Sequence, residues 1–512
     1  MMSARLLKST AVVGSATLLS RILGFIRDVV IAQAFGAGLA ADAFFVAFKI
    51  PNFLRRLFAE GAFSQAFVPV LSASQVRGNL GEVQQLVNRV AGTLGLVLLV
   101  VTLIGVIGAP LLVMIFAPGF IEEQSKYELT VSLLRITFPY LLFISLTALA
   151  AGILNTYKRF GVPAITPIFL NLALIAATLW LAPQLEIPVT ALAWGVFFAG
   201  LAQLLFQLPF LAHLNLLPRP RPRWKDPGVQ QIFKLMLPAI VGSSVAQINL
   251  LIDTLLASFL VTGSVSWLYY SDRLVEFPLG VFGIALATVI LPSLSEKHAQ
   301  ASSESFSRTL DWALRWVFLI GAPAAVGLVL LAGPILTTLF QYGEFSNHDV
   351  AMASRSLIAY SFGLLPFILI KVLAPGFYAR QDTRTPVRIA IIAMFANMVL
   401  NAMLIFPLAH AGLALATSLS AWLNAILLFF TLKRQGIYRP QPGWLWLSLR
   451  ILIATELMAI SILWLMPPLV SWLNWEVMTR IAEITLLIGA AVIIYFGTLL
   501  IIGIRPRMLA LT

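Results

Sequence analysis

The chain has 512 residues, of which 60% are hydrophobic and 11% charged, with a formal net charge of +13. A soluble globular protein has about 25% charged residues, so this composition excludes an ordinary soluble enzyme. It also excludes a disordered chain, which would need low hydrophobicity. The basic residues separate long apolar runs instead of forming one basic surface, so no nucleic-acid partner is expected. Because there is no cysteine, disulfides, thiolate nucleophiles and cysteine metal sites are excluded.

Apolar segments long enough to cross a bilayer recur along the whole chain. A spanning helix needs about 20 apolar residues, so the sequence predicts an all-α polytopic membrane protein with about fourteen transmembrane helices. The first segment is not a cleavable signal peptide, because Arg21 and Arg27 interrupt it. The predicted spans are residues 10–32, 41–70, 90–117, 131–154, 161–182, 188–211, 235–261, 267–293, 314–340, 352–377, 386–407, 410–432, 446–467 and 481–504.

The loop charges predict the orientation. If the N-terminus is cytoplasmic, most lysines and arginines fall in inside loops, as the positive-inside rule requires. The outside loops then hold Lys126 and carry acids such as Glu122, Glu123 and Glu344. We therefore expect both termini in the cytoplasm, with only short loops and no soluble domain on either side.

An internal repeat divides the chain. The run Pro69–Ser72 recurs as Pro292–Ser295, and Pro163 recurs as Pro386, both at an offset of 223 residues. Two parallel repeats are a transporter architecture, with the substrate site between the halves. The predicted organisation is an N-terminal six-helix lobe at 1–212, a basic cytoplasmic linker at 213–234, a C-terminal six-helix lobe at 235–435 and two extra helices at 436–512.

Charged residues inside the predicted spans are the strongest functional signal. Each one costs several kcal/mol when it faces lipid, so it should face a water-filled cavity or another charge. Basic residues outnumber acids, and the planar guanidinium of arginine favours phosphate, which indicates a phosphorylated, amphipathic substrate. The alternative is that these charges pair between helices or reach the interface, above all Arg56 and Glu60. The candidate substrate-binding residues are Arg21, Arg27, Asp28, Asp42, Lys49, Arg55, Arg56, Glu60, Asp272, Arg273 and Glu276.

Enzymatic chemistry has little support, and no catalytic residue is predicted. The short outer loops offer no poised carboxylate or histidine of the kind that acid–base chemistry on lipid-linked sugars requires. No phosphate-binding lysine loop is present, so ATP is not expected as the direct energy source. The four histidines are scattered without metal-ligand spacing.

Several motifs carry a family resemblance that extends over essentially the whole chain. They lie at residues 20–28 (SRILGFIRD), 35–38, 42–45, 51–64 (PNFLRRLFAEGAFS), 269–278 and 374–382. In these segments the chain resembles the MurJ (MviN) lipid II flippases of the multidrug/oligosaccharidyl-lipid/polysaccharide exporter superfamily. The resemblance implies two six-helix lobes around a central cavity, with the two extra helices framing a groove for the undecaprenyl tail. It places the family's functional charges on Arg21, Arg27, Asp28, Asp42, Arg55, Glu60 and Arg273.

The function implied is flipping of lipid II from the cytoplasmic to the outer leaflet by alternating access, for cell-wall synthesis. The expected location is the bacterial inner membrane. The expected partners are lipid II, membrane lipids and proteins of cell-wall synthesis, and the flippase itself is expected to be a monomer. Two alternatives stay open. One is an exporter of a drug or of another polyprenyl-linked oligosaccharide, and the other is a polytopic enzyme that acts on lipid-linked sugars.

The only cofactor that the sequence suggests is a sodium ion. Asp253 lies in the middle of a predicted span, while Asn397 and Asn401 are four residues apart and share a helix face. With Thr417 and the Leu413 carbonyl they make an oxygen set that suits a hard cation. Some members of the resembled family bind sodium between the same helices. The alternative is that Asp253 is protonated and hydrogen-bonded to an asparagine. It would then act as a contact between helices or as a proton carrier.

Overall fold

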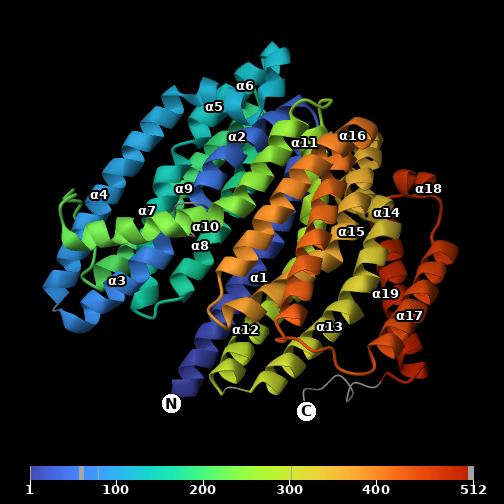
Figure 1. Ribbon diagram of the computed structural model, residues 1–512. Coiled ribbons are helices and arrows are strands. Elements are labelled where there is room, and N and C mark those ends of the chain that lie inside the picture. The colour runs from blue at the N-terminus through green and yellow to red at the C-terminus, as the bar shows by residue number, and fades with distance from the viewer. Residues whose placement is uncertain (1, 57–62, 79, 301, 505–512) are drawn as a thin grey trace. The chain divides into compact units, whose positions relative to one another are not determined.

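The computed structural model describes residues 2–56, 63–78, 80–300 and 302–504, and within these ranges every regular element is a helix (Figure 1). The chain divides into two compact units, Met1–Val265 and Ser266–Thr512. The predicted all-α polytopic fold is confirmed.

In the part of the first unit that the structure describes, ten α-helices pack together. α1 packs along α8, α8 and α7 both pack on α9, and α2 lies against α6. The helices are α1 (Met2–Phe35), α2 (Leu39–Arg55), α3 (Ser64–Arg77), α4 (Leu80–Ile107), α5 (Ala109–Phe116), α6 (Gln124–Thr137), α7 (Tyr140–Thr156), α8 (Gly161–Ala176), α9 (Thr190–His213) and α10 (Pro227–Ala257), with the short turns η2 (Pro118–Glu122), η3 (Ala177–Leu181) and η4 (Ala182–Gln184).

Helix α10 packs against α3, α4 and α5, so it belongs to the first compact unit. Its start is fixed by Asp226, whose carboxylate accepts hydrogen bonds from the backbone N–H groups of Gly228 and Val229. The repeat-based division had assigned residues 235–261 to the second lobe. The compact units are defined by contacts between residues, whereas the lobes are defined by a repeat in the sequence. The division into lobes therefore stays a prediction.

The second unit centres on α15, which packs against both α16 and α13. Helix α16 runs for 51 residues, but Ala409 inside it has φ 48°, so it consists of two helices joined at a kink just after Pro407. The helices are α11 (Ser264–Pro278), η5 (Leu279–Gly283), α12 (Ile284–Ala299), α13 (Ser303–Leu330), α14 (Ala332–Phe340), α15 (Asn347–Tyr378), α16 (Arg384–Arg434), α17 (Trp444–Leu465), α18 (Leu469–Asn474) and α19 (Val477–Ile501).

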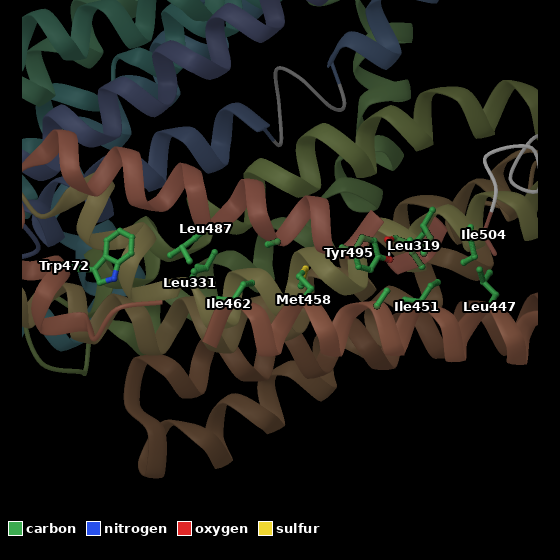
Figure 2. Packing of buried hydrophobic residues seen from close by; sticks show 13 residues of the cluster. Leu319, Leu331, Leu447, Ile451, Met458, Ile462, Trp472, Leu487, Tyr495 and Ile504 are labelled. Atoms are coloured by element: carbon green, nitrogen blue, oxygen red, sulfur yellow. Dashed lines mark hydrogen bonds between the residues drawn. The ribbon is translucent and has the colours of Figure 1, made fainter. Parts of the chain in front are cut away.

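The two extra helices predicted at the C-terminal end are α17 and α19, and they pack on each other and on α13 and α14. Figure 2 shows the buried cluster that joins them, from Trp472 at one end to Ile504 at the other. The opposite faces of the two helices are apolar and exposed, with Trp464 84% and Ile501 87% exposed. Such surfaces on a folded helix pair suit a hydrocarbon solvent and not water.

Ten helical stretches in the described residues are long and apolar enough to span a membrane, fewer than the fourteen predicted. The difference has identifiable causes. The stretch Arg384–Arg434 covers two predicted spans, 386–407 and 410–432. Helix α1 carries three charges, Arg21, Arg27 and Asp28, in its apolar part. The predicted span 41–70 corresponds to α2 and α3, and residues 57–62 between them lie outside the described residues. The predicted span 235–261 corresponds to α10, where some side chains lie outside the described part of the chain.

Candidate functional site

Arg27 and Asp28 form a buried ion pair on α1. The Arg27 Nη2 and Nε atoms donate to the Asp28 Oδ1 at 2.7 and 3.0 Å, and Arg27 Nη1 donates to the Asn171 Oδ1 on α8 at 3.0 Å. Asn171 also donates to the Ser20 carbonyl at 2.9 Å. Gly24 faces the Asn171 amide, where a Cβ would make an ordinary van der Waals contact at 3.6 Å. The charges predicted on the first span therefore also join α1 to α8.

Asp42 lies in the first turn of α2 and is 1% exposed. Its Oδ2 accepts from the Lys126 Nζ at 2.9 Å, and Lys126 itself is 3% exposed and sits 4.2 Å above the Phe120 ring. The sequence had placed Lys126 in an outside loop. A helix-face pattern gives no signal for it, because Lys126 and Asp42 are 84 residues apart.

The same carboxylate also holds the turn between α10 and α11. The Gly263 N–H donates to the Asp42 Oδ2 at 2.7 Å, and the Lys126 Nζ donates to the Thr262 hydroxyl at 3.1 Å. Gly263 has φ 101°, a conformation that a side chain would strain. Asp42, predicted as a substrate contact, is thus engaged in a buried network at one end of α2.

The remaining predicted charges of the first unit are less enclosed. Lys49, Arg55 and Arg56 are half-buried on the second half of α2, and the Arg55 Nε donates to the Asn52 Oδ1 at 2.8 Å. Arg21 is exposed on α1. Glu60 lies outside the described residues.

In the second unit the predicted charges lie together on α11. Arg273 donates to the Glu276 carboxylate at 2.7 Å, and its guanidinium carbon lies 5.1 Å from the Tyr269 ring centroid. The two side chains are 34% and 46% exposed, whereas Arg27 is almost fully buried. Asp272 is half-buried beside them. An exposed pair contributes about 1 kcal/mol or less, so a phosphate could replace Glu276 as the partner of Arg273 at small cost.

Four of the five predicted cation ligands lie together on α16. Asn401 Nδ2 donates to the Asn397 Oδ1 at 2.8 Å, Asn397 Nδ2 lies 3.3 Å from the Thr417 Oγ1, and Thr417 donates to the Leu413 carbonyl at 3.1 Å. Both asparagines are fully buried. Asp253 is 7% exposed and belongs to α10 of the first unit. Among the described residues, no three His, Cys, Asp or Glu side chains form a metal-binding group. The oxygens that α16 offers belong to two amides, a hydroxyl and a backbone carbonyl.

The motif at 374–382 ends in the turn that starts α16. Gln381 has φ 61°, and the Asp382 Oδ1 accepts from the Thr385 N–H at 3.0 Å. The hydrogen bonds from Thr385 lower the pKa of Asp382 below its ordinary value, so this carboxylate is ionised at neutral pH.

Comparison with known proteins decides the family. The model of the family described as "Lipid II flippase MurJ" matches residues 31–484. A "Probable lipid II flippase MurJ" of Vibrio cholerae is 52% identical, covering 99% of this chain and 98% of its own length. The chain belongs to the MurJ lipid II flippase family. A "Lipid II flippase MurJ" of Burkholderia cenocepacia is 43% identical over 98% of both chains.

Solved structures agree with this family. The chain is similar to the structure titled "Lipid II flippase MurJ, inward closed conformation", with a TM-score of 0.80 and 27% identity over 94% of this chain and 97% of that one. A multidrug resistance MATE transporter in an inward-facing conformation gives a TM-score of 0.65 at 15% identity, over 84% of this chain and 98% of that one, which shows the fold alone. Both similarities confirm the fold that the MurJ motifs imply.

The Asp42–Lys126 pair yields a stability prediction. Asp42→Ala leaves the Lys126 ammonium buried without its carboxylate, and we expect a loss of about 3–5 kcal/mol. Replacing both partners, as Asp42→Leu with Lys126→Met, removes both charges and should destabilise less than the single change. The measurement is thermal and denaturant unfolding of the purified protein.

Glu304→Ala is the matched control, because it breaks the exposed Arg308–Glu304 pair of α13. That change should cost about 1 kcal/mol or less. Equal losses for Asp42→Ala and Glu304→Ala would show that burial does not strengthen the dependence on the Asp42 carboxylate.

Proposed function

We propose that this protein moves lipid II from the cytoplasmic to the outer leaflet of the membrane by alternating access. The observation that carries the proposal is the 52% identity to a probable lipid II flippase over 99% of this chain. A diphosphate cannot cross hydrocarbon unaided, so the charged residues of α1, α2 and α11 would provide its polar path while the prenyl tail stays in lipid.

The arginines differ in how they would serve that path. Arg27 already directs three N–H groups to Asp28 and Asn171, so its role would be to fix α1 against α8 and to set the local charge. Arg55 and Arg273 are more exposed. These two are the residues that we expect to contact the diphosphate, because a guanidinium binds phosphate through paired N–H donors.

The cellular setting follows from the same family. We place the protein in the bacterial inner membrane with both termini in the cytoplasm, acting without enzymatic turnover of its substrate. We also propose that it acts as a monomer alongside proteins of cell-wall synthesis. The apolar helix faces and the excess of basic residues in one set of loops support this arrangement.

We further propose that a sodium ion is bound by Asp253 together with Asn397, Asn401, Thr417 and the Leu413 carbonyl. Support comes from the cluster that Asn397, Asn401 and Thr417 form on α16 through mutual hydrogen bonds. Such hard oxygen donors suit sodium. The ion would supply positive charge in the second unit and so bias the transport cycle, without competing for the substrate phosphates.

Lipid II transport should depend on Arg55 and Arg273, the two arginines that we expect to contact the diphosphate. In proteoliposomes loaded with labelled lipid II, we expect Arg55→Ala and Arg273→Ala each to lower the translocation rate at least about tenfold, since each removes a charge-assisted phosphate contact. Arg273→Lys should recover only part of the rate, because lysine offers a point charge. Arg308→Ala, which removes an exposed arginine paired with a glutamate on α13, should leave the rate unchanged. Failure of the unaltered protein to translocate lipid II would refute the function itself.

The orientation is tested by single cysteines in the cysteine-free chain. Ser125 is exposed in the first turn of α6, and Glu344 is exposed on the turn before α15. Ser125→Cys and Glu344→Cys should therefore react with an impermeant thiol reagent applied to intact cells, whereas Gln435→Cys should react only after lysis. Labelling of Gln435→Cys in intact cells would reverse the assignment of inside and outside.

Sodium binding should appear as ion-specific stabilisation. Bound ligand raises Tm, so NaCl should raise it above the value in KCl at equal ionic strength. Asp253→Asn and Asn397→Ala should each abolish this difference while the protein remains folded. A Tm that is the same in both salts, or a sodium effect that survives Asp253→Asn, would eliminate the site.

A further inference from the structure

The connection between α9 and α10 carries four cations at alternate positions. Residues 217–225 read Leu-Pro-Arg-Pro-Arg-Pro-Arg-Trp-Lys, and we call this stretch the basic segment. Arg219, Arg221, Arg223 and Lys225 are all exposed, and among the described residues none of them forms an ion pair. The segment contains no acidic residue. It runs beside α4 at one edge of the first unit (Figure 1).

The backbone of the basic segment is fixed to α4 at every second residue. The Arg219 N–H donates to the Asn88 Oδ1 at 2.7 Å, and the Arg221 N–H donates to the Asn88 carbonyl at 3.0 Å. The Arg223 N–H donates to the Thr93 hydroxyl at 3.1 Å. The intervening residues are prolines, which have no N–H to satisfy and which restrict φ. The alternation of arginine and proline therefore matches the pattern of backbone hydrogen bonds to α4, and it holds the cations in a fixed row.

Helix α4 is shaped to receive the segment. A Cβ on Gly92 would lie 2.4 Å from the Arg221 nitrogen and 2.5 Å from the Pro222 nitrogen, so only glycine allows the backbone this close. The next residue, Asp226, is buried and is used by the Arg89 side chain and by the start of α10. It is not available to neutralise the exposed arginines.

The attachment points place the basic segment at the depth of the membrane interface. Arg89 is the last charged residue of α4, and residues 90–107 contain none, so Asn88 and Thr93 bracket the point where the helix becomes suited to hydrocarbon. Trp224 is 57% exposed and its ring lies 4.9 Å from that of Phe233. Exposed tryptophans are typical of the headgroup layer.

We propose that the basic segment is a binding site for the headgroups of anionic phospholipids in the leaflet that borders the inside loops. A preorganised row of arginines at headgroup depth is complementary to a layer of lipid phosphates, and each cation near such a surface strengthens binding. Because prolines and three backbone hydrogen bonds already order the segment, little conformational entropy is lost when lipids bind. The site is separate from the charges on α1, α2 and α11 that we assign to the transported substrate.

The test is a lipid titration of the purified full-length protein in detergent, read out as Tm. Phosphatidylglycerol should raise Tm more than phosphatidylcholine does, because a ligand that binds the folded state stabilises it. In the variant with Arg219→Gln, Arg221→Gln and Arg223→Gln, the phosphatidylglycerol concentration that gives half of this rise should increase roughly 100-fold. The prolines and the backbone donors remain in that variant.

The matched control, Lys433→Gln with Arg434→Gln and Arg439→Gln, removes the same charge from exposed residues at the end of α16 and in the loop after it, and should keep the wild-type midpoint. For the unaltered protein, 0.5 M NaCl should remove the preference for phosphatidylglycerol, since salt screens exposed charges. This salt experiment uses the unaltered protein, so it tests the proposal even where the triple variant fails to fold. An unchanged midpoint in the basic-segment variant, an equal shift in the control, or a salt-insensitive preference would overturn the proposal. A stabilisation produced equally by inorganic phosphate would assign the segment to soluble phosphate instead of a bilayer.

Discussion

An ionised side chain in hydrocarbon has no water to solvate it, so the protein must provide its partners. This constraint explains two buried ion pairs of the first unit. Arg27 is solvated by Asp28 and Asn171, and Asp42 by Lys126 and the Gly263 N–H. Each set connects helices that are distant in the chain. The charges therefore hold the helices together as well as serving a polar path.

The same constraint separates the charges into two kinds. Where a guanidinium or carboxylate is enclosed by several protein donors and acceptors, as at Arg27 and Asp42, a substrate would have to displace contacts that the fold needs. Where the pair is exposed, as at Arg273 and Glu276, exchange of one partner for a phosphate costs little. A transporter needs both, since its helices must stay assembled while the substrate binds and leaves.

Sequence reasoning was sufficient for the class of fold, because hydropathy reports directly on the solvent that a helix meets. Sequence reasoning also grouped Asn397, Asn401 and Thr417, which hydrogen-bond to one another on α16, and their role as ion ligands stays a prediction. It missed Lys126 as the partner of Asp42, because that contact depends on tertiary packing across 84 residues. It also missed Asn171 as a partner of Arg27, although a lone amide within an apolar span indicates a buried polar contact.

The basic segment illustrates how one composition can serve two physical purposes. Cations in inside loops set topology while the chain inserts, an effect that needs only charge and not a fixed structure. Topology alone does not require prolines at every second residue or a glycine on α4 that admits the backbone of Arg221. Those features restrict the segment to one conformation in the folded protein. Fixed geometry is useful only when something binds in register with it, and the phosphates of the adjacent leaflet are the anions that lie at that depth.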